Sequence, residues 1–340
     1  MVTPATAGNI WTSTDLFAKT AGSGKRVLTD NDDDGEAPAV VQTPDGRLRV
    51  AWYNASNQSL LFAAEGHSSW EDNSPITIDS GLVGEWSDMA LEDDGDVHLV
   101  YYDRTGGTVK YAYHAEGESW YSWTTETIDT VGDITQGTAV AEVAAIAVDS
   151  EGTPHVAYYS ATGTHLAYAR RTGADTWVTA VLDDNGAGDV GTNPSIAIDR
   201  SDVVHLVYYD VTDMTLCYNS RTAAGWTGVQ AVEAPAGAAE PYGPNDLALD
   251  ALGNPHVVYT YQLATNAKNL KHAWIDTGAW TNETVDADGT GQHGYYPKMA
   301  ITQDGHAYIA YGINWAGSVY LADKAGVGEQ GGPDLAVTLA

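Results

Sequence analysis

The chain has few cysteines and basic residues and no long apolar run, and each of these features excludes particular functions. Its single cysteine, Cys217, excludes a disulfide within the chain, and the sequence around it offers no supporting His for a catalytic thiol. There are 15 Lys and Arg against 46 Asp and Glu, and the net charge is −31. Duplex DNA, RNA, anionic membrane surfaces and polyanionic glycans are therefore poor partners. No apolar run is long enough for a transmembrane segment or signal peptide, so we expect no membrane insertion.

Sustained helical periodicity is also missing, and a short tyrosine-rich phrase recurs instead at intervals of about 50 residues. ValHisLeuValTyrTyrAsp occurs at Val97 and again at Val204, with close variants between and after them. The six copies begin at Leu48, Val97, Pro154, Val204, Pro255 and Ala307. A period of this kind indicates a repeat architecture in which each copy is one structural unit.

Each copy predicts four short strands. A small apolar stretch comes first, and an Asp/Gly turn then leads into the tyrosine-rich phrase, so these two runs should pair as an antiparallel hairpin. A third alternating run follows, such as ThrValLysTyrAlaTyr from Thr108. The fourth begins at a Trp and ends at an acid, as in Trp123 to Asp129 and Trp177 to Asp183. Four strands per unit is the composition of a β-propeller blade.

The fold class predicted is therefore all-β, a six-bladed β-propeller of four-stranded antiparallel blades over residues 25–325. Residues 1–24 are expected to form an N-terminal extension. Lys25 to Asp30 has the ending of a fourth strand and directly precedes the first inner strand. We expect it to pair with the last blade and close the ring, because closure removes free sheet edges. The chain is long enough for this single domain, which we expect to be a monomer.

The repeated histidines look like a metal constellation but occupy one position in successive blades. These are His98, His155, His205 and His256. Equivalent positions around a ring lie too far apart to share one ion unless they line the axis, which the second strand does not. We expect them to bridge turns or blades. The Trp that opens each fourth strand is likewise expected to pack rather than to bind a ligand.

The whole repeat resembles propeller repeats of large bacterial secreted and surface proteins, in the broad sialidase-like and lectin-like group. The last residues, ProAspLeuAlaValThr from Pro333, resemble the opening strand of a cell-adhesion-related Ig-like domain. These resemblances imply that residues 326–340 are a Gly-rich linker and the start of a following module. They also imply an extracellular or cell-surface location and a role in adhesion.

Ligand-binding residues are expected where the repeat varies. The loops before each first strand and between the second and third strands share one face of a propeller, and the last two units concentrate aromatic residues there. Aromatic rings next to Asp and Asn suit a neutral sugar, which stacks on a ring and donates from its hydroxyl groups. The candidates are Trp86, Tyr242, Tyr261, His293, Tyr295, Tyr296, Lys298 and Trp315.

Carboxylates at the axial mouth leave an enzymatic alternative open. Asp88 and Asp246 occupy the same place in the first strands of their units, and Glu142 stands just upstream of another first strand. A glycoside hydrolase needs two carboxylates across the scissile bond, and Asp88 with Asp246 or Glu142 could supply them. A sialidase would need an arginine cluster that the sequence lacks. For a polysaccharide lyase, the best candidate catalytic pair is His293 with Tyr295.

An acidic loop suggests calcium. AspAsnAspAspAspGly at 30–35 fits the first half of a calcium loop, with Asp30, Asp32 and Asp34 at alternating ligand positions and Glu36 as a possible further ligand. Val41 stands where an EF-hand has its bidentate Glu, and a hydrated Asp/Gly linker is the alternative.

The sequence therefore predicts a non-catalytic recognition propeller that binds neutral carbohydrate or a protein partner. The alternative is a glycan-cleaving enzyme with carboxylates at the axial mouth.

Overall fold

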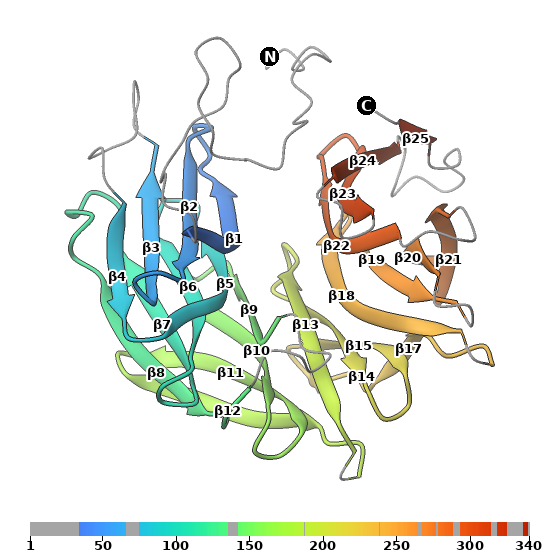
Figure 1. The fold of residues 1–340 in the computed structure, drawn as a ribbon, viewed down its shortest axis with the longest axis horizontal. Helices are drawn as coiled ribbons and strands as arrows, with labels where there is room; N and C mark the ends of the chain where they lie inside the picture. Colours follow the sequence, from blue (N-terminus) through green and yellow to red (C-terminus); the bar gives the residue numbers. More distant parts are fainter. Residues whose placement is uncertain are drawn as a thin grey trace.

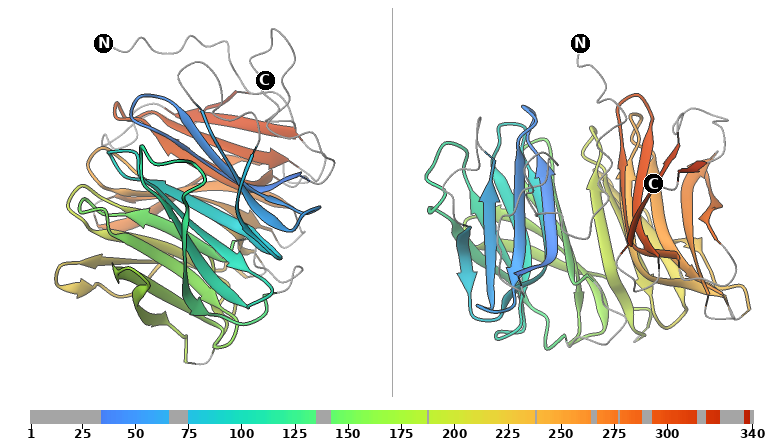
Figure 2. Two further views of the ribbon diagram at one scale, coloured as in Figure 1. Left: turned by 90° about the vertical axis from the view of Figure 1, so that its left-hand side faces the viewer. Right: turned by 45° about the horizontal axis from the view of Figure 1, so that its top comes forward.

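Six antiparallel sheets follow one another along the chain and stand around a central axis, as a six-bladed β-propeller (Figure 1). The computed structural model describes residues 34–65, 75–134, 142–186, 188–237, 239–263, 267–276, 278–287, 293–313, 318–324 and 336–338. This described part contains no helix, and hence none long and apolar enough to cross a membrane. The left-hand turned view shows the sheets as successive layers, from the first blade in blue to the last in red (Figure 2).

The blades have four strands in chain order from the axis outward, except that the outer strand of the fourth blade is divided into two short strands that both pair with β15. Those of the first three blades are β1 (Asp34–Gln42), β2 (Leu48–Asn54), β3 (Ser59–Ala64), β4 (Ile76–Ser80); β5 (Val83–Leu91), β6 (Val97–Asp103), β7 (Thr108–His114), β8 (Thr124–Thr130); and β9 (Ala144–Val148), β10 (Pro154–Ser160), β11 (His165–Gly173), β12 (Thr176–Asp183). Those of the last three are β13 (Val190–Ile198), β14 (Val204–Asp210), β15 (Thr215–Thr222), β16 (Gly225–Trp226) with β17 (Gln230–Glu233); β18 (Glu240–Leu249), β19 (Pro255–Gln262), β20 (Lys268–Asp276), β21 (Ala279–Asp286); and β22 (His293–Ile301), β23 (Ala307–Ile313), β24 (Ser318–Lys324), β25 (Ala336–Thr338).

The predicted fold class is confirmed, and the sixth blade differs from the expectation in its outer strand. β25 pairs antiparallel with β24, in the place that the sequence analysis assigned to Lys25 to Asp30. Residues expected to open a following module thus supply the backbone partners that the edge of β24 would otherwise lack. Lys25 to Asp30 itself, the N-terminal extension and the Gly-rich stretch 326–335 lie outside the described residues.

Adjacent blades approach closely because glycine stands early in the first strand. Gly84, Gly191 and Gly294 have φ of +101°, +98° and +82°. A Cβ at Gly191 would lie 2.5 Å from the Cα of Leu166 in the preceding blade, and one at Gly84 would lie 2.8 Å from the Cβ of Leu60. Only glycine fits here without displacing the neighbouring backbone.

The acid at the end of the fourth strand joins each of the first five blades to the next. It accepts a hydrogen bond from a tyrosine hydroxyl in the second strand of the following blade. The pairs are Tyr101 with Asp79, Tyr158 with Asp129, Tyr208 with Asp183, Tyr259 with Glu233, and Tyr311 with Asp286. The repeated acid and the repeated tyrosine are thus two halves of one contact.

The Trp that opens a fourth strand also packs between blades. Trp177, Trp226 and Trp280 each lie edge-on, at 5.1 Å between ring centroids, to a third-strand tyrosine of the preceding blade. The main apolar clusters likewise combine residues of neighbouring blades, for example Tyr111 with Ile146. Most of the hydrophobic core therefore lies between sheets.

The repeated histidines bridge within a blade. His98 contacts the Tyr111 hydroxyl at 2.7 Å through Nδ1 and the Glu92 carboxylate at 2.8 Å through Nε2. His155 makes the same pair of contacts with Tyr168 and Asp149. Each ring ties the turn of its hairpin to the third strand, which confirms the structural role expected for it.

Candidate functional site

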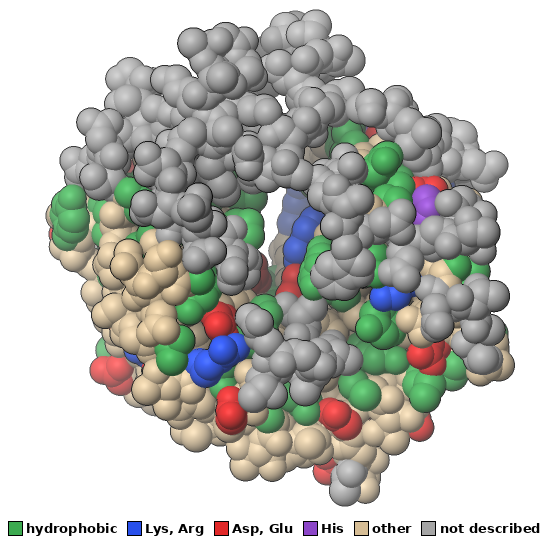
Figure 3. Space-filling model, viewed as in Figure 1, with side chains coloured by type: hydrophobic (Ala, Val, Ile, Leu, Met, Phe, Trp, Pro, Cys, Tyr) green, Lys and Arg blue, Asp and Glu red, His purple; other side chains and the backbone are tan. Residues whose placement is uncertain are grey.

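The axial opening is crossed by an ion pair. Lys298 Nζ, on β22 of the sixth blade, lies 2.8 Å from Glu142 Oε1, just before β9 of the third blade, and 3.4 Å from Asp246 Oδ1 on β18. The third and sixth blades stand opposite each other in a ring of six, so Lys298 spans the channel. Figure 3 shows basic and acidic side chains on the wall of this opening.

Two of the three carboxylates proposed for catalysis are held by backbone of the next blade. Asp88 accepts hydrogen bonds from the amides of Met89 and Ile146, both at 2.9 Å. Asp246 accepts one from Met299 at 2.7 Å. Burial raises the pKa of Asp88 to about 6, and it also raises the pKa of Asp246, against the opposing effect of Lys298. This geometry joins blades at the axis, and it occupies carboxylate oxygens that a glycoside hydrolase would need free.

Three of the predicted ligand-binding tyrosines come together where the fifth and sixth blades meet. Lys268 Nζ lies 3.9 Å from the ring centroid of Tyr242 and 4.7 Å from that of Tyr295. The Tyr296 ring is 6.5 Å from the Tyr295 ring. Tyr242 and Tyr296 are 36% and 55% exposed, whereas Lys268 is 7% exposed. We call Tyr242, Lys268, Tyr295 and Tyr296 the tyrosine patch.

Strand register explains why these residues meet. Tyr242 lies near the start of β18, whose first residue, Glu240, pairs with Gln262 at the end of β19, and Gln262 in turn pairs with Lys268 at the start of β20. Tyr295 and Tyr296 lie near the start of β22, which packs against β18 and β20. Tyr296 has φ of +45°, in a stretch where the register of β22 shifts, so the strand is locally kinked there. An irregular strand start therefore brings aromatic rings to the face that carries the variable loops.

The other predicted ligand-binding residues lie elsewhere. Tyr261 is buried, with Lys271 Nζ 4.4 Å from its ring centroid. His293 is also buried, and its Nδ1 lies 2.7 Å from Asp286. Trp86 is in the second blade, 5.8 Å from the ring of Tyr102, and Lys298 is in the axial ion pair. Trp315 lies outside the described residues.

Lys268 was not among the ligand-binding residues predicted from the sequence. Nothing in the local sequence marks it, because its role depends on Tyr242 and Tyr295, which come from two other strands. Among the described residues it is the cation closest to exposed aromatic rings.

The expected calcium loop is only partly within the described residues. Asp30 and Asp32 lie outside them. The backbone of Asp34 and Glu36 belongs to β1 and pairs with Asn54 and Tyr53, with register shifts around Glu36. Elsewhere among the described residues, no group of three or more His, Cys, Asp and Glu side chains is arranged to hold a metal ion.

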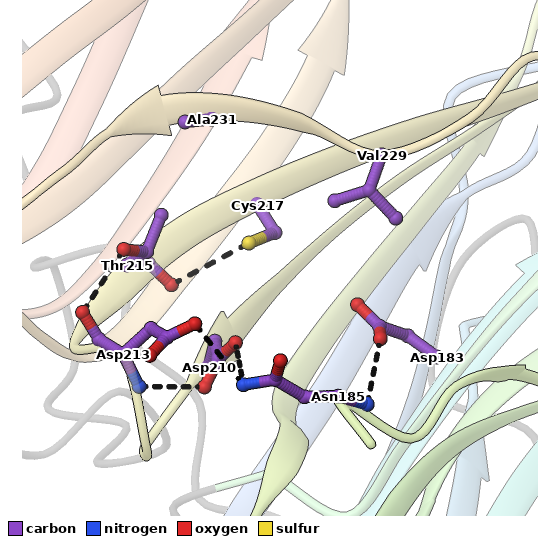
Figure 4. A pocket seen from close by; sticks show the side chains of 8 residues that line it. All are labelled: Asp183, Asn185, Asp210, Asp213, Thr215, Cys217, Val229 and Ala231. Atoms are coloured by element: carbon purple, nitrogen blue, oxygen red, sulfur yellow. Dashed lines mark hydrogen bonds between the residues drawn. The ribbon is translucent and has the colours of Figure 1, made fainter. Parts of the chain in front are cut away.

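A pocket of about 270 Å³ where the third and fourth blades meet brings acidic side chains close to the cysteine (Figure 4). Asn185 Nδ2 donates to Asp210 at 2.9 Å and to Asp213 at 3.1 Å, and Asp183 accepts from the Tyr208 hydroxyl. Burial, with a smaller effect of the nearby carboxylates, raises the pKa of Cys217 to about 12. The thiol is therefore protonated at neutral pH, which argues against nucleophilic catalysis in this pocket.

Comparison with known proteins shows the fold. No family model and no curated protein sequence matches the chain. Among solved structures it is similar to the fucose-recognising lectin of Aleuria aurantia, a six-bladed propeller (12% identity, 90% of this chain and 95% of that one, TM-score 0.53). It is also similar to AofleA of Arthrobotrys oligospora (14% identity, 96% and 94%, TM-score 0.52) and to a protein of unknown function from Dyadobacter fermentans (13% identity, 92% and 97%, TM-score 0.52).

Proposed function

We propose that this protein is a non-catalytic carbohydrate-recognition propeller whose binding site is the tyrosine patch. The observation that carries the proposal is the meeting of Tyr242, Tyr295 and Tyr296 around Lys268, with two of the rings exposed. An exposed ring offers a flat apolar surface for the C–H face of a sugar, and the phenol and ammonium groups can hydrogen-bond its hydroxyls. The likeness of the fold to a fucose lectin supports the same reading.

Recognition is preferred over glycan cleavage because of how the axial carboxylates are used. Asp88 and Asp246 accept backbone hydrogen bonds of the next blade, and Lys298 pairs with Asp246 and Glu142. Moving either aspartate into a catalytic position would leave a buried amide unsatisfied. In this proposal these carboxylates therefore have a structural role, because they join neighbouring blades at the axis.

The setting we propose is the surface or exterior of a bacterial cell, within a larger modular protein. It rests on the resemblance of the repeats. Bound Ca²⁺ at Asp30, Asp32, Asp34 and Glu36 belongs to the same proposal. An unchanged thermal unfolding midpoint after chelator treatment, together with no heat on titrating Ca²⁺, would remove it.

A glycan array probed with the wild-type protein and two variants tests the site. Tyr242→Ala should weaken binding to the best glycan by about five- to ten-fold, the worth of one aromatic contact. Tyr308→Ala is the matched control, because Tyr308 is 39% exposed but stacks on His306 in the same blade, outside the patch. Equal binding by both variants would reject the patch as the site, and no binding to any glycan by the wild type would reject carbohydrate recognition.

A further inference from the structure

Lys268 differs from the other lysines of the described residues in having no acidic partner among them. The other four each form an ion pair. The pairs are Lys110 with Asp79, Lys271 with Glu233, Lys298 with Glu142, and Lys324 with Glu283. Within the described part of the chain, no carboxylate lies within 4.0 Å of Lys268 Nζ, which donates to the Tyr295 hydroxyl at 3.5 Å.

Lys268 is nevertheless held where a bare charge is costly. The residue is 7% exposed, and burial lowers the pKa of its ammonium group. Two tyrosine rings stabilise a cation by about 0.5–2 kcal/mol each, which offsets only part of the cost of desolvating it. The chain has 46 acidic residues, yet none in the described part stands here. The position favours a ligand that brings its own negative charge.

We infer that the tyrosine patch recognises a glycan carrying an isolated carboxylate or sulfate group, with Lys268 as the residue that selects this anionic group. The inference rests on the proposed function and specifies its ligand class. A sugar ring would stack on the exposed Tyr242 or Tyr296, and its anionic group would pair with a partly desolvated ammonium. Such a pair is stronger than in bulk water because the local dielectric is lower.

The net charge of −31 limits which acidic glycans can bind. A long polyanion would be repelled by the rest of the surface, whereas a short glycan with one charge experiences mainly the local field of Lys268. The expectation of neutral carbohydrate drawn from the overall charge is thus replaced, at this one site, by an expectation of a singly charged one.

Lys271 provides a matched control three residues along the same strand. Its Nζ lies 4.4 Å from the Tyr261 ring and 6.0 Å from the Tyr259 ring, so it shares the aromatic setting of Lys268. It also pairs with Glu233, and its surroundings are buried. Replacing Lys271 removes a structural cation without touching the patch.

The test measures binding of short glycans that are neutral, uronate-bearing, sialylated or sulfated, by array and then by calorimetry. Wild-type protein should prefer one of the acidic classes, and the preferred class shows whether the patch binds a carboxylate or a sulfate group. Converting a bound uronate to its methyl ester should weaken binding by about 10- to 100-fold, since it removes the negative charge and adds only one methyl group. This comparison needs no variant and holds whether or not any variant folds.

Variants then assign the effect to Lys268. Lys268→Met should lose the preference for the acid over its ester, Lys268→Arg should keep most of it, and Lys271→Met should keep all of it. Preference for neutral glycans, or an acid preference unchanged in Lys268→Met, would overturn the inference and leave the proposed function standing. Absence of binding to every glycan would overturn both.

Discussion

At the scale of single residues, the ring is joined by side-chain contacts that repeat from blade to blade. The tyrosine hydroxyl bonds to Asp129 and Asp183 connect three successive blades, at distances of 2.8 and 2.7 Å. The acid at the end of a fourth strand is visible in the sequence, but its tyrosine partner lies 22–29 residues further on and is found only once the blades are placed. Such contacts can be tested one at a time.

Tyr158→Phe should lower the free energy of unfolding by about 1–2 kcal/mol, because the Asp129 carboxylate loses a charge-assisted hydrogen bond between blades. Urea denaturation followed by tryptophan fluorescence measures it. Tyr121→Phe is the control, since Tyr121 is 69% exposed and its change should stay within about 0.5 kcal/mol. A Tyr158→Phe protein as stable as the control variant would show that the contact contributes little.

The buried histidines predict loss of stability in mild acid. Burial is the main cause that lowers the pKa of His98 and of His256 to about 4, and it also lowers the pKa of His155 and His205. The unfolded chain binds these protons near pH 6.5 and the folded chain does not, so stability is full above that pH and falls between about 6.5 and 4.

For His98 alone the full loss is about 3 kcal/mol. Denaturation midpoints at pH 7, 5.5 and 4.5 measure the trend, and His98→Gln should make it shallower. A midpoint that rises on acidification in the wild type, or an equal slope in the variant, would contradict this account of the histidines.

At the scale of strands and blades, much of the fold follows from the sequence. The tyrosine-rich phrase predicts the second strand of every blade, and the Asp/Gly turn predicts the hairpin before it. The interruption of one fourth strand at Gly228, with φ of +101°, and the pairing of β25 with β24 were not predictable from the repeat. The first is a local backbone break, and the second depends on which chain segment reaches the open edge of the last blade.

Gly191→Ala should disrupt the approach of the third and fourth blades. The added Cβ would meet the Leu166 backbone at 2.5 Å, and φ at this residue is +98°. We expect a loss of at least about 2 kcal/mol beyond that of Gly237→Ala. Gly237 also has positive φ, at +72°, but nothing lies within 4 Å of its added Cβ. Equal losses in thermal or urea unfolding would show that backbone strain alone accounts for the effect.

At the scale of the whole molecule, the net charge can be predicted from the sequence, but the local charge at the tyrosine patch cannot. The charge of −31 is read directly from the composition, and its average effect predicted a neutral ligand. The local charge at the tyrosine patch has the opposite sign because Lys268 is brought between Tyr242 and Tyr295 by three separate strands. Exposed loop aromatics were therefore predictable as candidates, whereas the cation beneath them required the assembled structure.

Self-repulsion of this charge predicts that salt stabilises the fold. Raising NaCl from about 0.1 to about 1 M shortens the screening length from about 10 to about 3 Å. The thermal unfolding midpoint should rise, since repulsion among surface carboxylates weakens more than the short contacts between blades. Sucrose at equal osmolality controls for solvent exclusion. If the midpoint instead falls with NaCl, exposed ion pairs stabilise the fold more than repulsion among the carboxylates destabilises it.

The most direct measurement is a crystal structure of the protein with the best glycan from the array. The account predicts electron density for a sugar ring against Tyr242 or Tyr296, with its anionic group directed toward Lys268. Density in the axial opening beside Asp88, Glu142 and Asp246, or between two other blades, would contradict the assignment of the tyrosine patch as the binding site.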